Sequence, residues 1–214
     1  MTNVIKQLNR KIAARNRAFA RMTAAGKRVA IAKDVLAQLS GGKLRATHGT
    51  YFDVGKSKYG KLAAGTGKDL SELLPELGTC NVCAVGALFT CAVGFADKLK
   101  VAHVDDLADV DGHANGNSIV LRTAVDGERW INTDTYGYLA KFFTERQLQN
   151  MESAFENDGG AIDGEWVRYG LPANPRKRIE AIMRNVVQNK GSFVPEKLYR
   201  QFAGKKAGRA SAAA

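Results

Sequence analysis

The sequence has few cysteines and no long apolar run. Its three cysteines are an odd number that lies within twelve positions, which is unlike the disulfide framework of a small secreted protein. No stretch approaches the roughly 18 consecutive apolar residues of a membrane span. Basic residues interrupt the first apolar run, so we expect neither a signal peptide nor contact with a membrane. These features favour a protein of a reducing cytoplasm.

Acidic residues are missing from the first thirty positions. Residues 1–30 contain eight Lys or Arg and no Asp or Glu, and residues 175–214 contain ten against two, whereas residues 31–174 carry a net negative charge. The total of +11 is therefore concentrated at the two ends. Basic ends are typical of segments that bind a polyanion, most often nucleic acid. Two alternatives stay open: the charge keeps the protein soluble, or it binds an acidic protein.

Hydrophobic periodicity predicts a mostly helical α+β fold. Apolar residues at helical spacing place helices at residues 3–23, 27–39, 69–77, 81–96, 144–155, 175–190 and 195–203. One β-hairpin or a small antiparallel sheet is expected where Asp126-Gly127 separates two β-rich runs, because both turn positions need positive φ. The predicted organisation is a basic N-terminal helical arm (1–26), a single α+β domain (27–203) and a disordered basic tail (204–214).

Polar residues mark the starts of two of these helices. Thr144 and Gln147 have the spacing of a capping box. Asn174 and Pro175 suit an N-cap and the first helical position. Gly26 is expected to interrupt the helical pattern between the first two helices.

The segment from Thr79 to Gly94 holds all three cysteines. Its polar start and its run of small and apolar residues predict a buried helix with a thiol in the first turn. A helix N-terminus favours the thiolate, so such a thiol can be reactive. The simplest interpretation is nevertheless that the cysteines are small packing residues. The predicted core stripe of this helix comprises Ala84, Ala87, Leu88, Cys91 and Ala92.

Three chemical roles are alternatives to packing. A zinc site lacks its second C-x2-C or H-x3-H pair, so we expect no metal and no cofactor. A dithiol redox pair needs a preceding strand, where the sequence predicts a helical stretch. The sharpest alternative is a nucleophilic Cys80 or Cys83 with His113 as its base and Asp134 as the orienting group. His48, in T-H-G-T-Y, is interpreted as a polar residue at a bend.

Basic residues near both ends are the candidate nucleic-acid contacts. Few aromatic residues lie among them, and no recognition-helix motif is visible, so we expect phosphate contacts without base readout. The candidates are Lys6, Arg10, Lys11, Arg15, Arg17, Arg21, Arg176, Lys177, Arg178, Arg184, Lys205, Lys206 and Arg209.

Five short segments carry a resemblance to other proteins. They are I-A-K-D-V-L-A-Q-L (31–39), T-H-G-T-Y (47–51), C-N-V-C-A-V-G-A-L-F (80–89), Q-L-Q-N-M-E-S-A-F-E (147–156) and R-I-E-A-I-M-R-N-V-V-Q-N-K-G-S-F-V-P (178–195). Together they are similar to a group of proteins of tailed bacteriophages and their hosts for which no activity is established. The resemblance implies a phage or prophage setting and an accessory role, and it implies no catalytic residue.

The sequence therefore supports three hypotheses. The first is a non-enzymatic phage-type accessory protein of the host cytoplasm that binds nucleic acid through its basic ends. The second is a cysteine-dependent hydrolase or transferase. The third is a virion component or an inhibitor that binds a host protein.

Overall fold

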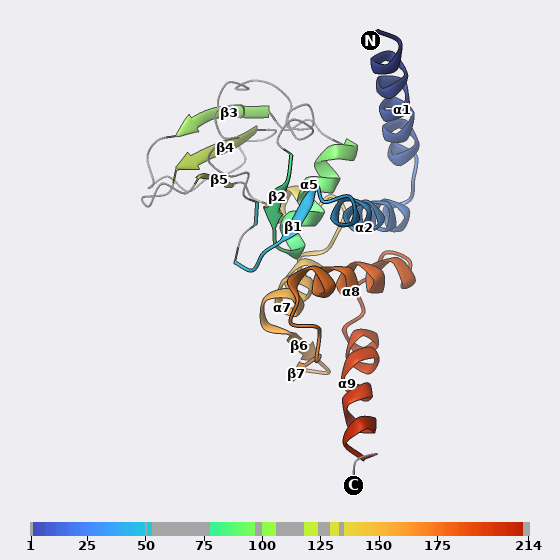
Figure 1. The fold of residues 1–214 in the computed structure, drawn as a ribbon, viewed down its shortest axis with the longest axis vertical. Helices are drawn as coiled ribbons and strands as arrows, with labels where there is room; N and C mark the ends of the chain where they lie inside the picture. The colour runs from blue at the N-terminus through green and yellow to red at the C-terminus, as the bar shows by residue number, and fades with distance from the viewer. Residues whose placement is uncertain are drawn as a thin grey trace.

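The structure of the protein is a computed structural model that describes residues 2–49, 51–52, 78–96, 100–105, 118–123, 129–132 and 135–211. Its helices are α1 (Thr2–Ala20), α2 (Ala24–Ser40), α5 (Ala84–Ala96), α6 (Thr135–Leu139), α7 (Glu145–Asn157), α8 (Pro175–Gln188) and α9 (Pro195–Ser211). Its strands are β1 (Leu44–Ala46), β2 (Cys80–Val82), β3 (Lys100–Asp105), β4 (Ser118–Thr123), β5 (Arg129–Asn132), β6 (Gly159–Ile162) and β7 (Glu165–Arg168). The fold is mostly helical α+β, as predicted. Figure 1 shows α1 and α9 extending from opposite ends of the molecule.

Helix α5 lies at the centre of the core. It carries no charged residue, and ten of its thirteen residues are buried. Helices α1, α2, α6 and α7 and strand β2 pack against it. Alanine, glycine and cysteine allow these neighbours to approach closely, which gives the dense packing of a protein interior. The predicted core stripe is confirmed, and burial extends around most of the helix.

Local capping explains where three of the helices begin. The Thr144 side chain accepts from Gln147 N in the predicted capping box, and Asn174 caps α8 with Pro175 at the start of the helix. Helix α2 begins earlier than predicted, because Thr23 Oγ1 accepts from Gly26 N at 3.1 Å. The prediction that Gly26 interrupts the helical pattern is wrong, because Gly26 lies in the first turn of α2, after the N-cap Thr23.

Among the described residues, two of the three sheets contain a parallel pair. Strand β1 pairs with β2 in parallel, with Ala46 opposite Val82. Strand β3 pairs in parallel with β4, and β4 pairs antiparallel with β5, with Thr123 opposite Arg129. The antiparallel pairing of the predicted hairpin is confirmed, and its Asp126-Gly127 tip lies outside the described residues.

A second hairpin, β6–β7, lies in a segment where the sequence analysis places no helix or strand. Its strands pair antiparallel with Ile162 opposite Glu165. The two residues between them, Asp163 and Gly164, have φ values of 52° and 86°. Positive φ at both positions is what a tight hairpin turn requires, and aspartate followed by glycine supplies it.

Two further predictions are corrected. The cysteine helix begins at Ala84 and not at residue 81, because Cys80–Val82 is drawn into a strand beside β1. Disorder is predicted from residue 204, but the backbone of α9 stays helical to Ser211. This part of the chain has no proline and is rich in alanine, lysine and arginine, which are good helix formers. The helix predicted at 69–77 lies outside the described residues.

Candidate functional site

The cysteine segment changes from strand to helix at Cys83. This residue follows β2 directly and precedes α5, so it occupies the N-cap of the central helix. Its carbonyl accepts from Ala87 N at 2.9 Å, and its sulfur accepts from Gly86 N at 3.4 Å. The thiol thus lies against the unpaired N–H groups at the start of a buried helix, where partial positive charge accumulates.

A loop from the neighbouring strand covers this end of α5. Thr47, the first residue after β1, donates from its N–H to Val82 O at 2.9 Å. Further along, the backbone of Tyr51 lies directly on Gly86. A Cβ atom at Gly86 would fall 1.5 Å from Tyr51 O, so only glycine permits this contact. The T-H-G-T-Y segment and the C-A-V-G segment therefore form one site.

Two glutamates of α7 hold the same loop from the other side. Glu156 accepts from Gly49 N at 3.1 Å and lies 3.1 Å from His48 Nδ1. The Tyr51 hydroxyl donates a hydrogen bond to Glu152. The His48 ring also stacks on Phe155, with 4.6 Å between ring centroids.

The site places a buried thiol beneath exposed side chains. Cys83 is 3% exposed, whereas Tyr51 is 43% exposed. Burial raises the pKa of the Cys83 thiol to about 12, and its bonds to the N–H groups of Gly86 and Val85 partly oppose this rise. Burial and the bond to Glu152 likewise raise the pKa of Tyr51. Both groups are therefore neutral at physiological pH.

The structure describes the predicted nucleophiles Cys80 and Cys83 but not their predicted partners. Cys80 is buried in β2, and Cys91 is buried in α5, where burial and Asp34 raise the pKa of its thiol. His113 and Asp134 lie outside the described residues. The carboxylates that act on the Cys83 thiol belong instead to Glu152 and Glu156 of α7, and Glu156 also contacts His48 of the loop after β1. The strand that a dithiol motif needs does precede Cys83, contrary to the sequence prediction.

His48 and Glu156 are the site residues that sequence reasoning missed. Their contact joins positions 108 residues apart, and no local pattern indicates it. One signal was available: T-H-G follows an extended segment, and the loop after a strand often carries functional side chains.

The basic candidates fall into three groups. Arg10, Lys11, Arg15, Arg17 and Arg21 are exposed, on or just after α1, and Lys6 lies on the same helix. Arg176, Lys177 and Arg184 are exposed on α8. Lys205, Lys206 and Arg209 lie on the helical backbone of α9.

Arg178 is a correction to the predicted contacts. It is only 8% exposed, and its guanidinium donates to Pro172 O at 3.0 Å and to Phe155 O at 2.7 Å. These bonds join α8 to the end of α7. The Arg178 guanidinium therefore makes a structural contact inside the protein and does not face an external phosphate.

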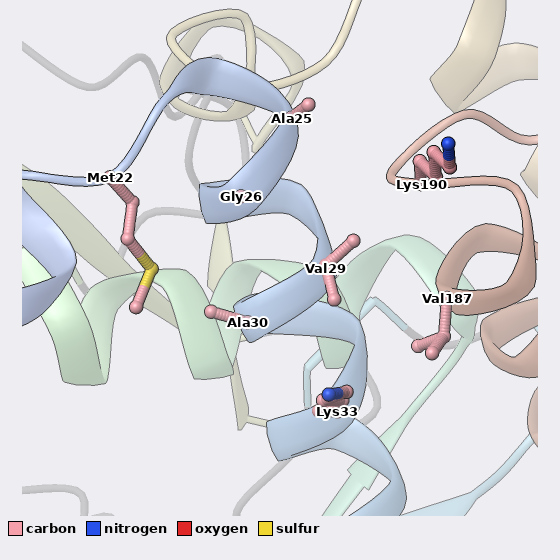
Figure 2. A pocket seen from close by; sticks show the side chains of 8 residues that line it. All are labelled: Met22, Ala25, Gly26, Val29, Ala30, Lys33, Val187 and Lys190. Atoms are coloured by element: carbon pink, nitrogen blue, oxygen red, sulfur yellow. The ribbon is translucent and has the colours of Figure 1, made fainter.

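An apolar groove lies between the start of α2 and the end of α8 (Figure 2). Its volume is about 590 Å³, and Met22, Val29 and Val187 line it. Lys33 and Lys190 also line it, and they add positive charge beside α2 and the end of α8.

The described residues contain no cluster of three or more His, Cys, Asp or Glu side chains that could hold a metal ion. Within the same part of the chain, no helix has the length and apolar character needed to cross a bilayer. Comparisons of the chain with protein-family models, with curated proteins and with solved structures found no match.

Proposed function

We propose that the protein is a cytoplasmic, phage-type accessory protein that binds nucleic acid through the basic face of helix α1. The observation that carries this proposal is a helix of nineteen residues with no acidic residue and with its described basic side chains exposed. The phage setting is supported by the resemblance of residues 28–195 to proteins of tailed bacteriophages.

The charges of α1 form a stripe. Lys6, Arg10 and Arg17 follow one another at intervals of four and seven residues, which places them on one side of a helix with 3.6 residues per turn. From Lys6 to Arg17 the stripe extends about 16 Å at 1.5 Å per residue, and Arg21 follows directly after the helix ends at Ala20. A row of cations of this length matches the closely spaced phosphates of a nucleic-acid backbone.

The opposite face of α1 docks on the core. Phe19 lies nine residues after Arg10, or two and a half turns, and is 2% exposed. Its ring stacks on Phe95 of α5 with 4.6 Å between centroids. Arg15 donates to Gly94 O at 2.6 Å and lies over the Phe95 ring. These contacts direct the basic stripe away from the protein, in agreement with the projecting helix of Figure 1.

The basic residues of α8 make a weaker contribution. Glu180 pairs with Arg176 at 3.0 Å and with Arg184 at 3.8 Å. A cation that already has a carboxylate partner gains less from a phosphate, because the first ion pair must be shared or broken. Helix α1 has no such internal anion, so we assign it the principal contact.

Binding is expected to depend on phosphates and not on base identity. Each neutralised phosphate releases condensed counterions, so affinity falls steeply with salt concentration. DNA and RNA of unrelated sequence should therefore bind similarly at low salt.

The test compares two variants that lose the same charge. In the first, Arg10, Arg17 and Arg21 are changed to Gln; in the second, the exposed Arg146, Arg168 and Arg200 are changed to Gln. We expect the first variant to bind fluorescent duplex DNA at least tenfold more weakly at about 50 mM salt and with a smaller salt slope. The second should stay within about threefold of the unchanged protein.

Two results would contradict the proposal. The first is no anisotropy change of the unchanged protein with DNA or RNA at about 50 mM salt, which would favour an acidic protein partner for α1. The second is an equal loss of affinity in both variants, which would show that net charge acts without any contribution from this helix.

A further inference from the structure

We propose that the apolar groove between the start of α2 and the end of α8 binds an amphipathic helix of a partner protein. The partner helix carries an apolar stripe that is flanked by acidic residues. The groove is a second binding surface, which uses other residues than the basic stripe of α1 and does not depend on nucleic-acid binding.

Apolar side chains reach the solvent along this groove. Met22 is 41% exposed, although it is a large apolar residue, and Val29 and Val187 are half-buried. Figure 2 shows Val29 on the side of α2 that faces Val187, with Met22 on the other side of the helix. A single exposed apolar residue is common on protein surfaces, whereas apolar residues that gather in a groove mark a binding surface.

Gly26 lies between the two sides of the groove (Figure 2). The three atoms nearest to a Cβ at this position would all belong to Met22 and Thr23, which are part of the same stretch of chain. Among the described residues, no other element therefore packs tightly over Gly26. The groove is open at this point, and its volume of about 590 Å³ leaves room for several side chains of an occupant.

The spacing of the lining residues favours a helical occupant. On α2 they are residues 25, 26, 29, 30 and 33, which share one face of the helix. From Ala25 to Lys33 this face extends about 12 Å, or a little over two turns. A second helix packs along such a face by placing its own side chains into the groove between two helices.

Lys33 and Lys190 indicate the charge of the occupant. Both line the groove and are exposed, and none of the residues that line it is acidic. In the described part of the chain, neither ammonium group pairs with a carboxylate, whereas Arg176 and Arg184 of α8 both pair with Glu180. The two lysines are therefore available to carboxylates of a partner. An apolar groove with cations along it complements an apolar stripe that is flanked by Glu or Asp.

The same features favour a protein over a nucleic acid in the groove. A phosphate backbone would pair with the two lysines and leave the apolar side chains of Met22, Val29 and Val187 without an apolar partner. An amphipathic helix removes these side chains from water, and burial of apolar surface is the main source of affinity in such a contact. The lysines then select among helices by charge.

The experiment measures the binding of two synthetic helical peptides to the native full-length protein by fluorescence anisotropy. Both peptides carry leucine on one face at the i, i+4, i+7, i+11 spacing; one has glutamate beside this stripe, and the other has lysine. The salt concentration is about 0.15 M, at which exposed charges are largely screened beyond about 8 Å. We expect the acidic peptide to bind with a Kd of about 100 µM or tighter, and the basic peptide to bind about tenfold more weakly or not at all.

Reversal of the charge in the groove should reverse this preference. Lys33→Glu combined with Lys190→Glu should weaken the acidic peptide about tenfold and strengthen the basic one. Both lysines are exposed, so their replacement leaves the fold intact. Lys43→Glu combined with Lys177→Glu is the matched control, because these exposed lysines lie at the opposite ends of the same two helices. Val29→Gln should weaken both peptides, since it removes an apolar contact and keeps the charges.

Three results would overturn the proposal. The first is no binding of the acidic peptide, and the second is an equal loss of affinity in the charge-reversed protein and in its matched control. The third is an equal loss in a protein with Arg10 and Arg17 changed to Gln, which would place the peptide on α1. No nucleic acid enters these measurements, so the groove and the DNA-binding proposal fail independently.

Discussion

Helices α1 and α5 pack against each other and are built on opposite principles. Helix α1 has no acidic residue and carries one fully buried aromatic side chain, Phe19, among its described side chains. Helix α5 has no charged residue at all, and burial covers nearly all of it. A cation is costly to bury without a partner, whereas small apolar residues gain stability from burial.

This difference separates two tasks. The residues of α1 contribute little to the core, so their charge remains available to an external polyanion. The residues of α5 hold the core together, and its first turn also fixes Cys83 and the loop over it. Substitutions in α5 should therefore change stability, and substitutions on the outer face of α1 should change binding.

The largest expected effect is in the middle of α5. Leu88 is fully buried, and Leu88→Ala should lower the free energy of unfolding by about 2–5 kcal/mol. Chemical denaturation measures this change. Ile12→Ala provides the comparison in α1, where the side chain is 41% exposed, and should cost less than about 1 kcal/mol. Equal losses would remove the distinction between the two helices.

The next effect is at the first turn of α5. Gly86→Ala introduces a Cβ that would lie 1.5 Å from Tyr51 O, so the loop that carries Tyr51 must move. We expect a loss of about 1–3 kcal/mol, the usual cost of overpacking, together with faster labelling of Cys83 by iodoacetamide. Gly94→Ala is the control, because a Cβ there meets only Arg15, at 3.8 Å. A Gly86→Ala protein with unchanged melting and labelling would show that the loop does not rest on α5.

Alkaline pH should lower the free energy of unfolding, in part through Cys83. Burial raises the pKa of Cys83 from 9.0 to about 12, so the folded thiol keeps its proton where the unfolded thiol loses it. This contribution is complete below about pH 9 and is lost between pH 9 and 12, at about 1.4 kcal/mol per pH unit. In urea denaturation between pH 8.5 and 10.5, Cys83→Ser should show a shallower decline than the unchanged protein. An identical decline would place the sensitivity at Cys91, Tyr51 and Tyr169, whose pKa values burial also raises.

Local signals predicted the longer helices and missed the five-residue helix α6 and both parallel strand pairs. The caps at Thr144 and Asn174 act over three residues, so sequence alone places α7 and α8 correctly. Strands β1 and β2 have three residues each and lie more than thirty positions apart. A pairing this short and this distant leaves no periodicity in the sequence. Because residues 80–82 pair with β1, α5 begins at Ala84 and not at the predicted residue 81. The β6–β7 hairpin has the same Asp-Gly turn signal as the predicted hairpin, but each strand has only four residues and β6 begins with two glycines, which hides its β character.

The candidate site was predictable only in part. A thiol at the start of a buried helix follows from the composition around Cys83. Its neighbours do not, because His48 reaches the site through the β1–β2 pairing and Glu156 through the packing of α7 on α5. Contacts that depend on two non-local pairings at once cannot be inferred from spacing along one chain.

The smallest expected effect concerns the joint between the two helices. Arg15 is exposed, yet its guanidinium donates to Gly94 O at 2.6 Å and lies 4.4 Å from the centre of the Phe95 ring. We expect Arg15→Ala to destabilise the protein by about 1 kcal/mol, from one hydrogen bond and one surface cation–π contact. Amide hydrogen exchange in α1 should also become faster, because Phe19 would then carry most of the contact between the helix and α5. Arg17→Ala removes the same charge two positions away, on the outward stripe, and should leave both stability and exchange unchanged while weakening DNA binding. If the two variants behave alike in both measurements, Arg15 does not orient α1 on α5. The division between a core helix and a binding helix would then be wrong.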